Sequence, residues 1–317
     1  PRRNHHTCRA GALHRVRNDQ LKEMKKGQQA YIYAALSVML WGTIPTAFKI
    51  ALSELSIVTM LGVTTLVSTA VLFAIMFVTG KLCLLRQTTG RELLWSALLG
   101  LVNPVGYYLI LLTAYSRLPG QVAQPINMIW PIILVFFSIP LLGHRIPARS
   151  FLALAISLVG VYIISSQGAP LKPGRSDTLG VMLALVSGVL WALYFVLNVR
   201  DRRDESVKLF TSFAFGSVYM LILMATGGSF THALSIKGVA ASVYCGFFEM
   251  GITFWLWLKA LQLSETTDKV SNLVYFAPFI SLILLHFIID EPVYYTTPLG
   301  LLLIIGSVIY QNRTQRA

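Results

Sequence analysis

Apolar residues in this 317-residue chain occur in runs of about twenty, separated by short breaks rich in charged residues, Pro and Gly. A helix needs about 20 mostly apolar residues to cross the hydrocarbon core of a bilayer. Since no break is long enough to hold a soluble domain, we expect any function to lie within the helix bundle. The runs predict ten transmembrane helices, near residues 30–50, 57–79, 93–114, 122–142, 150–167, 178–199, 208–228, 238–261, 269–289 and 296–311.

The second half of the chain repeats the pattern of the first. Corresponding positions lie 146 to 150 residues apart, as in the pairs Trp41 and Trp191, Gly100 and Gly246, Gly160 and Gly306, and Pro131 and Pro278. Because each copy has five helices, an odd number, the second copy enters the membrane from the opposite side. The sequence therefore predicts an all-α membrane protein whose ten transmembrane helices form two inverted five-helix repeats, an arrangement that recurs in secondary transporters.

Composition and charge agree with a membrane protein. Hydrophobic residues make up 55% of the chain and charged residues 12%, against about a quarter charged in soluble domains. The net charge of +13 reflects orientation, since most Lys and Arg fall on one side of the predicted bundle. The positive-inside rule then predicts a multi-pass protein of the cell inner (plasma) membrane with both termini cytoplasmic. Nucleic acid is not an expected partner. Only five Lys and Arg would face the opposite side: Lys49, Arg117, Lys172, Arg175 and Lys237.

The predicted boundaries are a basic tail over residues 1–28, a first repeat over 29–167, a linker over 168–177, a second repeat over 178–312 and a tail over 313–317. Residues 1–23 are polar and basic and lack helical apolar periodicity, while Met24 reads like a natural start, so we expect the first tail to be disordered.

Cys8, Cys83 and Cys245 are scattered and fit neither a disulfide framework nor a metal site. We therefore expect neither metal nor cofactor.

Several segments together resemble a known family: AALSVMLWGT paired with LALVSGVLWAL, and PGQVAQPINMIWPIILVFFSIPLLG paired with VSNLVYFAPFISLILLHFIIDEPV. They resemble tandem EamA-like domains of the drug/metabolite transporter superfamily over about residues 28–312. The N-x-x-W-P pattern at Asn127 to Pro131 is similar to bacterial aromatic amino-acid exporters, although Met128 departs from the aromatic residue expected there. The resemblance implies a ten-helix bundle with a central cavity open to one side at a time, and export of small organic metabolites such as amino acids or drugs. It implies no ATP hydrolysis, and the sequence holds no G-x-x-x-x-G-K-[ST] loop.

Glu249 is the one acid deep within an apolar run. Burying its charge would cost several kcal/mol unless it were paired or protonated, so it is a candidate for binding a proton or the polar head of a substrate. Asn103 occupies the equivalent position in the first repeat and is its expected partner across the cavity. The alternative is a neutral, hydrogen-bonded structural acid that joins helices.

Pro131 and Pro278 remove helical hydrogen bonds to the carbonyls of Asn127 and Val274 and are expected to kink the fourth and ninth spans as gating elements, or merely to improve packing. A carbonyl group that loses its helical hydrogen bond at membrane depth must be hydrogen-bonded by neighbouring residues or by water in a cavity.

Aromatic rings away from the span ends could stack on a planar substrate or cation, although aromatic residues also serve packing and interface belts. The remaining candidate substrate-binding residues are Gln124, Asn127 and Trp130 near Pro131, and the aromatic residues Trp41, Tyr107, Trp191 and Tyr275.

The predicted function is therefore a secondary transporter, with export of small organic molecules favoured and import on the same fold as the alternative. A membrane-embedded enzyme is a weaker alternative, because it predicts clustered ionisable groups such as H-E-x-x-H, which the sequence lacks. The expected partners are a small-molecule substrate, membrane lipid and protons as a candidate coupling ion. The chain is expected to act as a monomer or homodimer.

Overall fold

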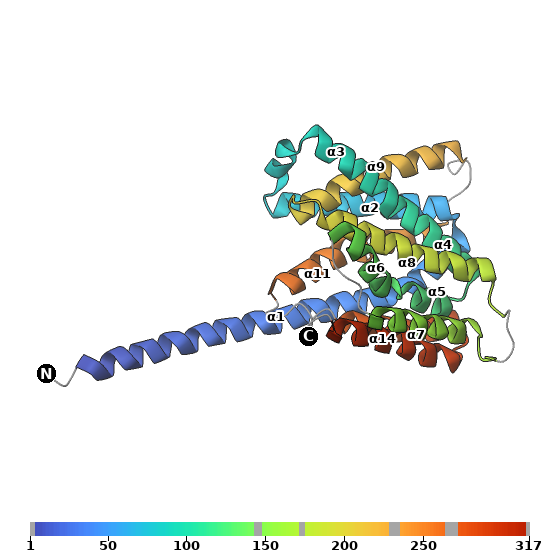
Figure 1. Cartoon of the computed structure of the whole chain (residues 1–317). Helices are drawn as coiled ribbons and strands as arrows, with labels where there is room; N and C mark the ends of the chain where they lie inside the picture. The colour runs from blue at the N-terminus through green and yellow to red at the C-terminus, as the bar shows by residue number, and fades with distance from the viewer. Residues whose placement is uncertain (1–3, 143–147, 171–174, 228–234, 264–271, 315–317) are drawn as a thin grey trace.

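The computed structural model describes residues 4–142, 148–170, 175–227, 235–263 and 272–314, which contain helices and connecting turns but no strand. Figure 1 shows them as one helical bundle with a long N-terminal extension. The helices are α1 (Asn4–Glu54), α2 (Ile57–Val78), α3 (Gly90–Gly100), α4 (Tyr107–Arg117), α5 (Gly120–Asn127), α6 (Trp130–Leu142), α7 (Ala148–Ser165), α8 (Thr178–Val199), α9 (Glu205–Thr226), α10 (Ile236–Phe248), α11 (Ile252–Leu263), α13 (Ala277–Ile289) and α14 (Thr296–Thr314). Three short helical turns complete the described structure: η1 (Leu82–Gln87), η2 (Leu101–Gly106) and η4 (Asn272–Phe276).

Each of the ten predicted spans contains helix in the structure. Within the described residues, six helical segments are long and apolar enough to cross a membrane, and shorter apolar helices lie at 150–165, 273–289 and 296–310. The prediction of an all-α membrane protein is confirmed. Many apolar side chains on the outside of the bundle are exposed, for example Phe77 and Phe287, as expected for helices whose solvent is lipid.

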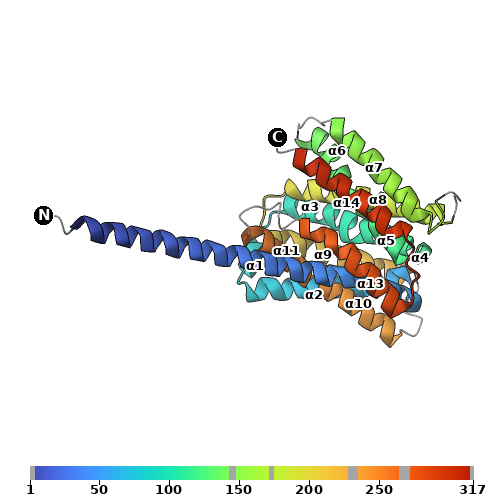
Figure 2. The same ribbon diagram turned by 90° about the horizontal axis from the view of Figure 1, so that it is seen from below.

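The helix packing follows a pseudo-two-fold axis that exchanges the two repeats. In Figures 1 and 2, α7 and α14 lie side by side, and the Oγ atoms of Ser157 and Ser307 are 2.6 Å apart. Likewise α2 packs on α9, with 2.8 Å between Thr69 Oγ1 and Ser217 Oγ. These partners are 150 and 148 residues apart, the separation of the repeat itself. A residue can touch its own repeat equivalent only beside the symmetry axis, so the internal repeat of the sequence is also a repeat in space.

Four spans are broken, and the breaks fall at equivalent places in the two repeats. The third span breaks at η2 between α3 and α4, where Asn103 has the extended backbone angles φ −145° and ψ 122°. The eighth span breaks between α10 and α11, just after Phe248. The fourth span breaks between Asn127 and Trp130, and the ninth passes from η4 into α13 at Ala277. Pro131 and Pro278 each stand beside the start of the following helix, and their role as gating elements stays a prediction.

Glycines let the spans approach closely at equivalent positions. A Cβ on Gly246 would lie 2.7 Å from the carbonyl oxygen of Thr64, and Gly100 lies in the same way against the carbonyl of Ser212. Thr64 and Ser212 are themselves 148 residues apart. Gly160 and Gly306 do not share an environment, because Gly160 packs against the backbone of α14 whereas Gly306 faces open space. That predicted pair therefore matches in sequence but not in packing.

The N-terminal stretch differs from the disordered tail expected over residues 1–28. The structure describes it as helix from Asn4 onward, continuous with the first span, and Figures 1 and 2 show it projecting away from the bundle. A helix that extends an anchored span needs no new nucleus, and the stretch contains good helix formers such as Ala, Leu, Arg and Lys. Helix formation here follows from continuity with the first span rather than from an apolar face.

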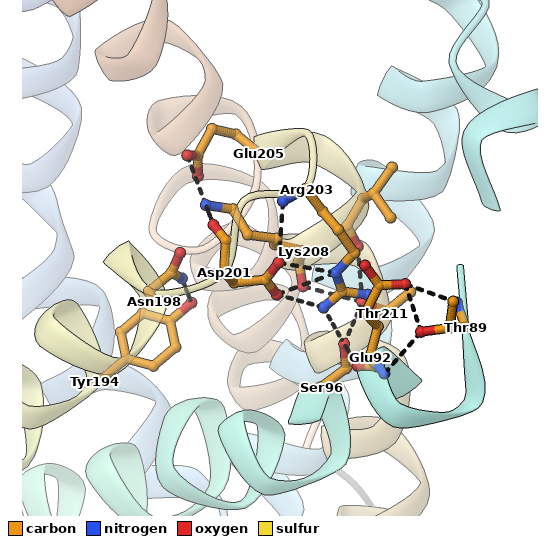
Figure 3. A network of polar contacts seen from close by, with 11 residues as sticks. Thr89, Glu92, Ser96, Tyr194, Asn198, Asp201, Arg203, Glu205, Lys208 and Thr211 are labelled. Atoms are coloured by element: carbon orange, nitrogen blue, oxygen red, sulfur yellow. Dashed lines mark hydrogen bonds and ion pairs between the residues drawn. The ribbon is translucent and has the colours of Figure 1, made fainter. Parts of the chain in front are cut away.

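An ion pair anchors the loop between α8 and α9 at one end of the bundle (Figure 3). Arg203 Nη2 donates to Asp201 Oδ2 at 2.5 Å and to Ser96 Oγ of α3 at 2.7 Å. Burial raises the pKa of Asp201, but the hydrogen bonds and charge of Arg203 outweigh burial and leave the pKa below its ordinary value. Because breaking a buried pair leaves an uncompensated charge, the ion pair holds the Arg203 guanidinium in place, and its hydrogen bond to Ser96 joins the second repeat to the first at this end.

The topology can be tested with cysteines. Glu54 ends α1 just before α2 begins, and its ion pair places Lys237 at that end of α2, where the Lys237 side chain is 66% exposed. Cys83 is exposed just beyond the other end of α2. With Cys8→Ser as background, an impermeant maleimide should label Lys237→Cys in intact cells. It should label Cys83 only after the membrane is permeabilised. The reverse pattern would contradict cytoplasmic termini.

The close approach of α10 to α2 predicts a packing effect. We expect Gly246→Ala to lower the free energy of unfolding by about 1–3 kcal/mol, because the added methyl group meets the Thr64 carbonyl and the Val67 side chain. Thermal unfolding in detergent measures this loss. Gly306→Ala is the matched control, with open space around the added methyl group, and should leave the melting temperature unchanged or raise it. Equal effects of the two changes would contradict the packing described here.

Candidate substrate site

Glu249 lies at the break of the eighth span, where it follows the last residue of α10. Its Oε1 accepts a hydrogen bond of 2.9 Å from the hydroxyl of Tyr108 on α4. None of the ion pairs formed by the described residues includes Glu249. The carboxyl group is thus held by a neutral donor from the other repeat.

Asn103 lies at the equivalent break of the third span. It is 1% exposed. Its Oδ1 has no hydrogen-bond partner among the described residues. Glu249 bonds to Tyr108, and no hydrogen bond between described residues joins it to Asn103. The proposed pairing of Asn103 with Glu249 across a cavity stays a prediction.

Aromatic rings from both repeats form a continuous cluster next to Glu249. The ring centroids of Tyr108 and Tyr107 are 4.6 Å apart, and those of Tyr107 and Trp191 are 4.7 Å apart. The repeat equivalents Trp41 and Trp191 both contact Phe254, with centroids 6.0 and 6.1 Å apart. We use the name aromatic cluster for Trp41, Tyr107, Tyr108, Trp130, Trp191, Tyr194, Phe195, Phe254 and Trp257.

The break of the fourth span brings further candidate residues to the aromatic cluster. Asn127 Oδ1 accepts a hydrogen bond of 3.4 Å from Tyr107, and Asn127 Nδ2 donates to Ser187 Oγ of α8 at 2.8 Å. Trp130 stacks on Phe195 at 5.3 Å. Gln124 is buried, and its Oε1 has no hydrogen-bond partner among the described residues. Gln124 and Asn127 are three residues apart on α5, so they share one face of that helix.

Tyr275 lies beside the break of the fourth span. It belongs to a second apolar core with Ile129, Ile132 and Leu282, and Ile129 adjoins Trp130 in the chain. Asn103, Tyr107, Gln124 and Asn127 are buried, whereas Trp41, Trp130, Trp191 and Glu249 are half-buried. A cavity of about 260 Å³ lies between α7 and α8, and its walls include Leu158, Tyr162, Ser165 and Val181. None of the candidate residues lines this cavity.

Sequence reasoning missed Phe254, Trp257 and Ser187, which complete the surroundings of the site. Phe254 could have been found from the repeat, because it stands 146 residues after Tyr108. Ser187 carries no comparable signal, since a serine within an apolar helix is common and its contact with Asn127 depends on how two distant spans pack.

Polar contacts close the bundle where α5 meets the segment between α13 and α14. Glu291 accepts hydrogen bonds from the backbone N–H groups of Gly120 at 2.7 Å and Gln121 at 3.1 Å. The side-chain oxygen of Gln121 accepts from Thr297 Oγ1 at 3.0 Å. Lys49 Nζ donates to the carbonyls at positions 115 and 118, each at 3.0 Å. The contacts of Glu291 and Gln121 join the first repeat to the second, whereas Lys49 holds α1 to the end of α4 within the first repeat.

Comparison with known proteins adds independent support. The EamA-like transporter family matches the chain twice, over residues 28–166 and 178–312. The chain is 26% identical over 304 residues to the uncharacterized transporter YvbV of Bacillus subtilis, covering 94% of this chain and 95% of that protein. It is 24% identical over 238 residues to an uncharacterized transporter of Clostridium kluyveri, covering 73% and 76%.

A solved crystal structure shares the fold, with a TM-score of 0.62 and 20% identity over 90% of this chain and 99% of that one. At this identity the likeness concerns the fold alone. The paired family match, the packing of two equivalent repeats and the apolar spans together lead to one conclusion: the chain belongs to the EamA-like transporter family and is a multi-pass membrane transporter of the drug/metabolite transporter type.

Proposed function

We propose that this transporter exports small organic metabolites, such as amino acids or drugs, across the plasma membrane by alternating access. The observation that carries the proposal is the position of Asn103 and Glu249 at equivalent helix breaks. Broken spans at the interface of inverted repeats are where secondary transporters bind substrates and coupling ions. The aromatic cluster beside Glu249 supplies apolar and planar surface for an organic molecule.

Glu249 is proposed to couple transport to protons. A charged carboxylate in apolar surroundings costs several kcal/mol unless a proton or a cation neutralises it. Its bond to Tyr108 orients the group but brings no charge. Proton and substrate would therefore bind alternately at the same carboxyl group, which is the exchange that a proton-coupled exporter requires.

The breaks beside Pro131 and Pro278 are proposed to act as hinges. Each removes helical hydrogen bonds at one place, so the halves of the span can tilt while their own hydrogen bonds persist. Opening the end that holds Glu291 would release the Gly120 and Gln121 N–H groups, whereas closing it would restore both bonds.

Flux measurements test this proposal directly. The full chain in proteoliposomes with an imposed pH gradient should accumulate at least one solute from a panel of amino acids, organic amines, organic acids and cationic drugs. Orientation-resolved flux separates export from import, which is the alternative on the same fold. Failure to move any member of a broad panel, in vesicles shown to hold folded protein, would refute the transport proposal.

Glu249→Gln is predicted to abolish proton-driven accumulation while leaving insertion intact, because the amide keeps the shape and hydrogen bonding but cannot titrate. Substrate exchange without a pH gradient should persist if the substrate does not require the charge. Uptake is measured as a function of pH in proteoliposomes. An unchanged pH dependence would remove Glu249 from the mechanism and favour the Asn127 to Pro131 segment.

The matched control is Asp290→Asn. Asp290 is an exposed residue with φ +55°, a conformation that Asn adopts readily. The control therefore also replaces a carboxyl group by an amide, but away from the site, and should retain accumulation and its pH dependence.

A further inference from the structure

The cavity between α7 and α8 lies between the two repeats, because α7 ends the first and α8 begins the second. α7 packs chiefly along α14, whereas α8 packs chiefly along α4 and α6, and a space of about 260 Å³ remains between them. Just after α7, the N–H of Gly168 donates to Thr296 Oγ1 at the start of α14. The cavity therefore lies at the end of the bundle that holds Glu291.

Most of the cavity wall is apolar and borders a surface that faces lipid. Leu158 and Tyr162 line the cavity and are each about half exposed. On α8, Leu179 and Met182 are equally exposed beside the wall residue Val181. Hydrocarbon chains surround a membrane span, and water is a poor occupant of an apolar space because it lacks polar partners there. This part of the cavity therefore suits an acyl chain.

Hydroxyl groups and a cation gather where the cavity meets the ends of the two helices. Ser165, Ser176 and Thr178 line the cavity here, and Ser165 Oγ has no hydrogen-bond partner among the described residues. Ser176 Oγ accepts a hydrogen bond of 2.9 Å from Gln167 Nε2. The exposed Arg175 donates to the carbonyl of the same Gln167 at 3.4 Å. The guanidinium group is thus held beside the hydroxyl end of the cavity.

The charge at this end is positive. None of the ion pairs formed by the described residues includes Arg175, and the neighbouring acid Asp177 is paired with Arg117 at 2.8 Å. Guanidinium and hydroxyl groups both donate hydrogen bonds to phosphate oxygens, and basic residues near the membrane surface attract anionic lipids. The polar end of the cavity therefore suits a phosphate group, and the apolar part suits the chain attached to it.

We propose that this cavity binds one anionic phospholipid of the surrounding bilayer, with an acyl chain between α7 and α8 and the phosphate at Arg175 and Ser165. The lipid contacts both repeats and fills the space that their helices leave open. The site is separate from the candidate substrate site, because none of the candidate residues lines the cavity. The inference requires a membrane protein but is independent of what the protein transports.

Two lipids with identical acyl chains test the class of ligand. Phosphatidylglycerol is an anion, whereas phosphatidylethanolamine carries a compensating ammonium group. Native mass spectrometry of the delipidated full chain measures the affinity of the first bound lipid, and thermal unfolding in detergent measures the stabilisation. Phosphatidylglycerol should bind about fivefold more tightly, the factor expected from one basic residue near the membrane surface, and should raise the melting temperature more. Inorganic phosphate should not raise it.

Two variants separate the charge from the chain. Arg175→Gln should make the affinities of the two lipids nearly equal, whereas Lys237→Gln, which removes an exposed cation at the same end of the bundle, should retain the preference. Val181→Phe fills the apolar part of the cavity and should weaken both lipids. Val186→Phe is its matched control, since this residue of α8 is exposed and does not line the cavity. If Val181→Phe fails to fold, the comparison of Arg175→Gln with Lys237→Gln decides.

Crosslinking locates the bound lipid. A phosphatidylglycerol with a diazirine in its acyl chain should crosslink to residues 158–166 and 176–181, and unlabelled phosphatidylglycerol should compete better than phosphatidylethanolamine. Equal binding of the two lipids by the unaltered chain would overturn the proposal, as would a preference that survives Arg175→Gln or is equally lost in Lys237→Gln. Stabilisation by inorganic phosphate alone would indicate a site for the free anion, and competed crosslinks confined to other spans would place the lipid elsewhere; either result would refute the assignment.

Discussion

The absence of water inside a bilayer is the constraint on which this structure depends. An unpaired backbone group costs several kcal/mol in hydrocarbon, so a span can break only where protein covers the break. In the eighth span, Ser68 of α2 donates to the Gly246 carbonyl at 3.0 Å, and the Thr253 hydroxyl donates to the Phe248 carbonyl. The close packing that Gly246 allows brings Ser68 within reach. Glu249 can therefore stand at a break without leaving the neighbouring backbone unsatisfied.

Duplication gives the two repeats the same frame but different chemistry. The breaks of the third and eighth spans are equivalent, yet one presents an amide at Asn103 and the other a carboxyl group at Glu249. Trp41 and Trp191 are also equivalent, and they converge on a single ring, Phe254. In the proposed alternating access, a symmetric frame would let either end of the bundle open by equivalent movements, and the one carboxyl group at the breaks would be reached from both sides.

The sequence was sufficient for the features that depend on local pattern. Run length predicted the spans, prolines predicted the breaks beside Pro131 and Pro278, and the depth of Glu249 singled it out. It could not predict which ring would meet Glu249, because the Tyr108 contact joins residues 141 positions apart and depends on helix rotation. The sequence likewise could not predict that Tyr275 would pack against Ile129 and Ile132, because that contact depends on the rotation of the ninth span. Apolar pattern alone also gave no hint that the first helix continues back to Asn4.

Both ends of the bundle are closed by polar contacts between the repeats, which constrains how the transporter can move. At one end Glu291 holds the start of α5 through Gly120; at the other, Lys81 pairs with Asp204 at 2.8 Å and Arg203 reaches Ser96. Opening either end separates charged or hydrogen-bonded partners, although water entering the opening replaces much of what is lost. A ligand can shift this balance only if it binds the closed and open states with different affinity. A substrate that fits between the repeats only when both ends are closed would supply that difference, so the contacts that recognise the substrate would also drive closure around it.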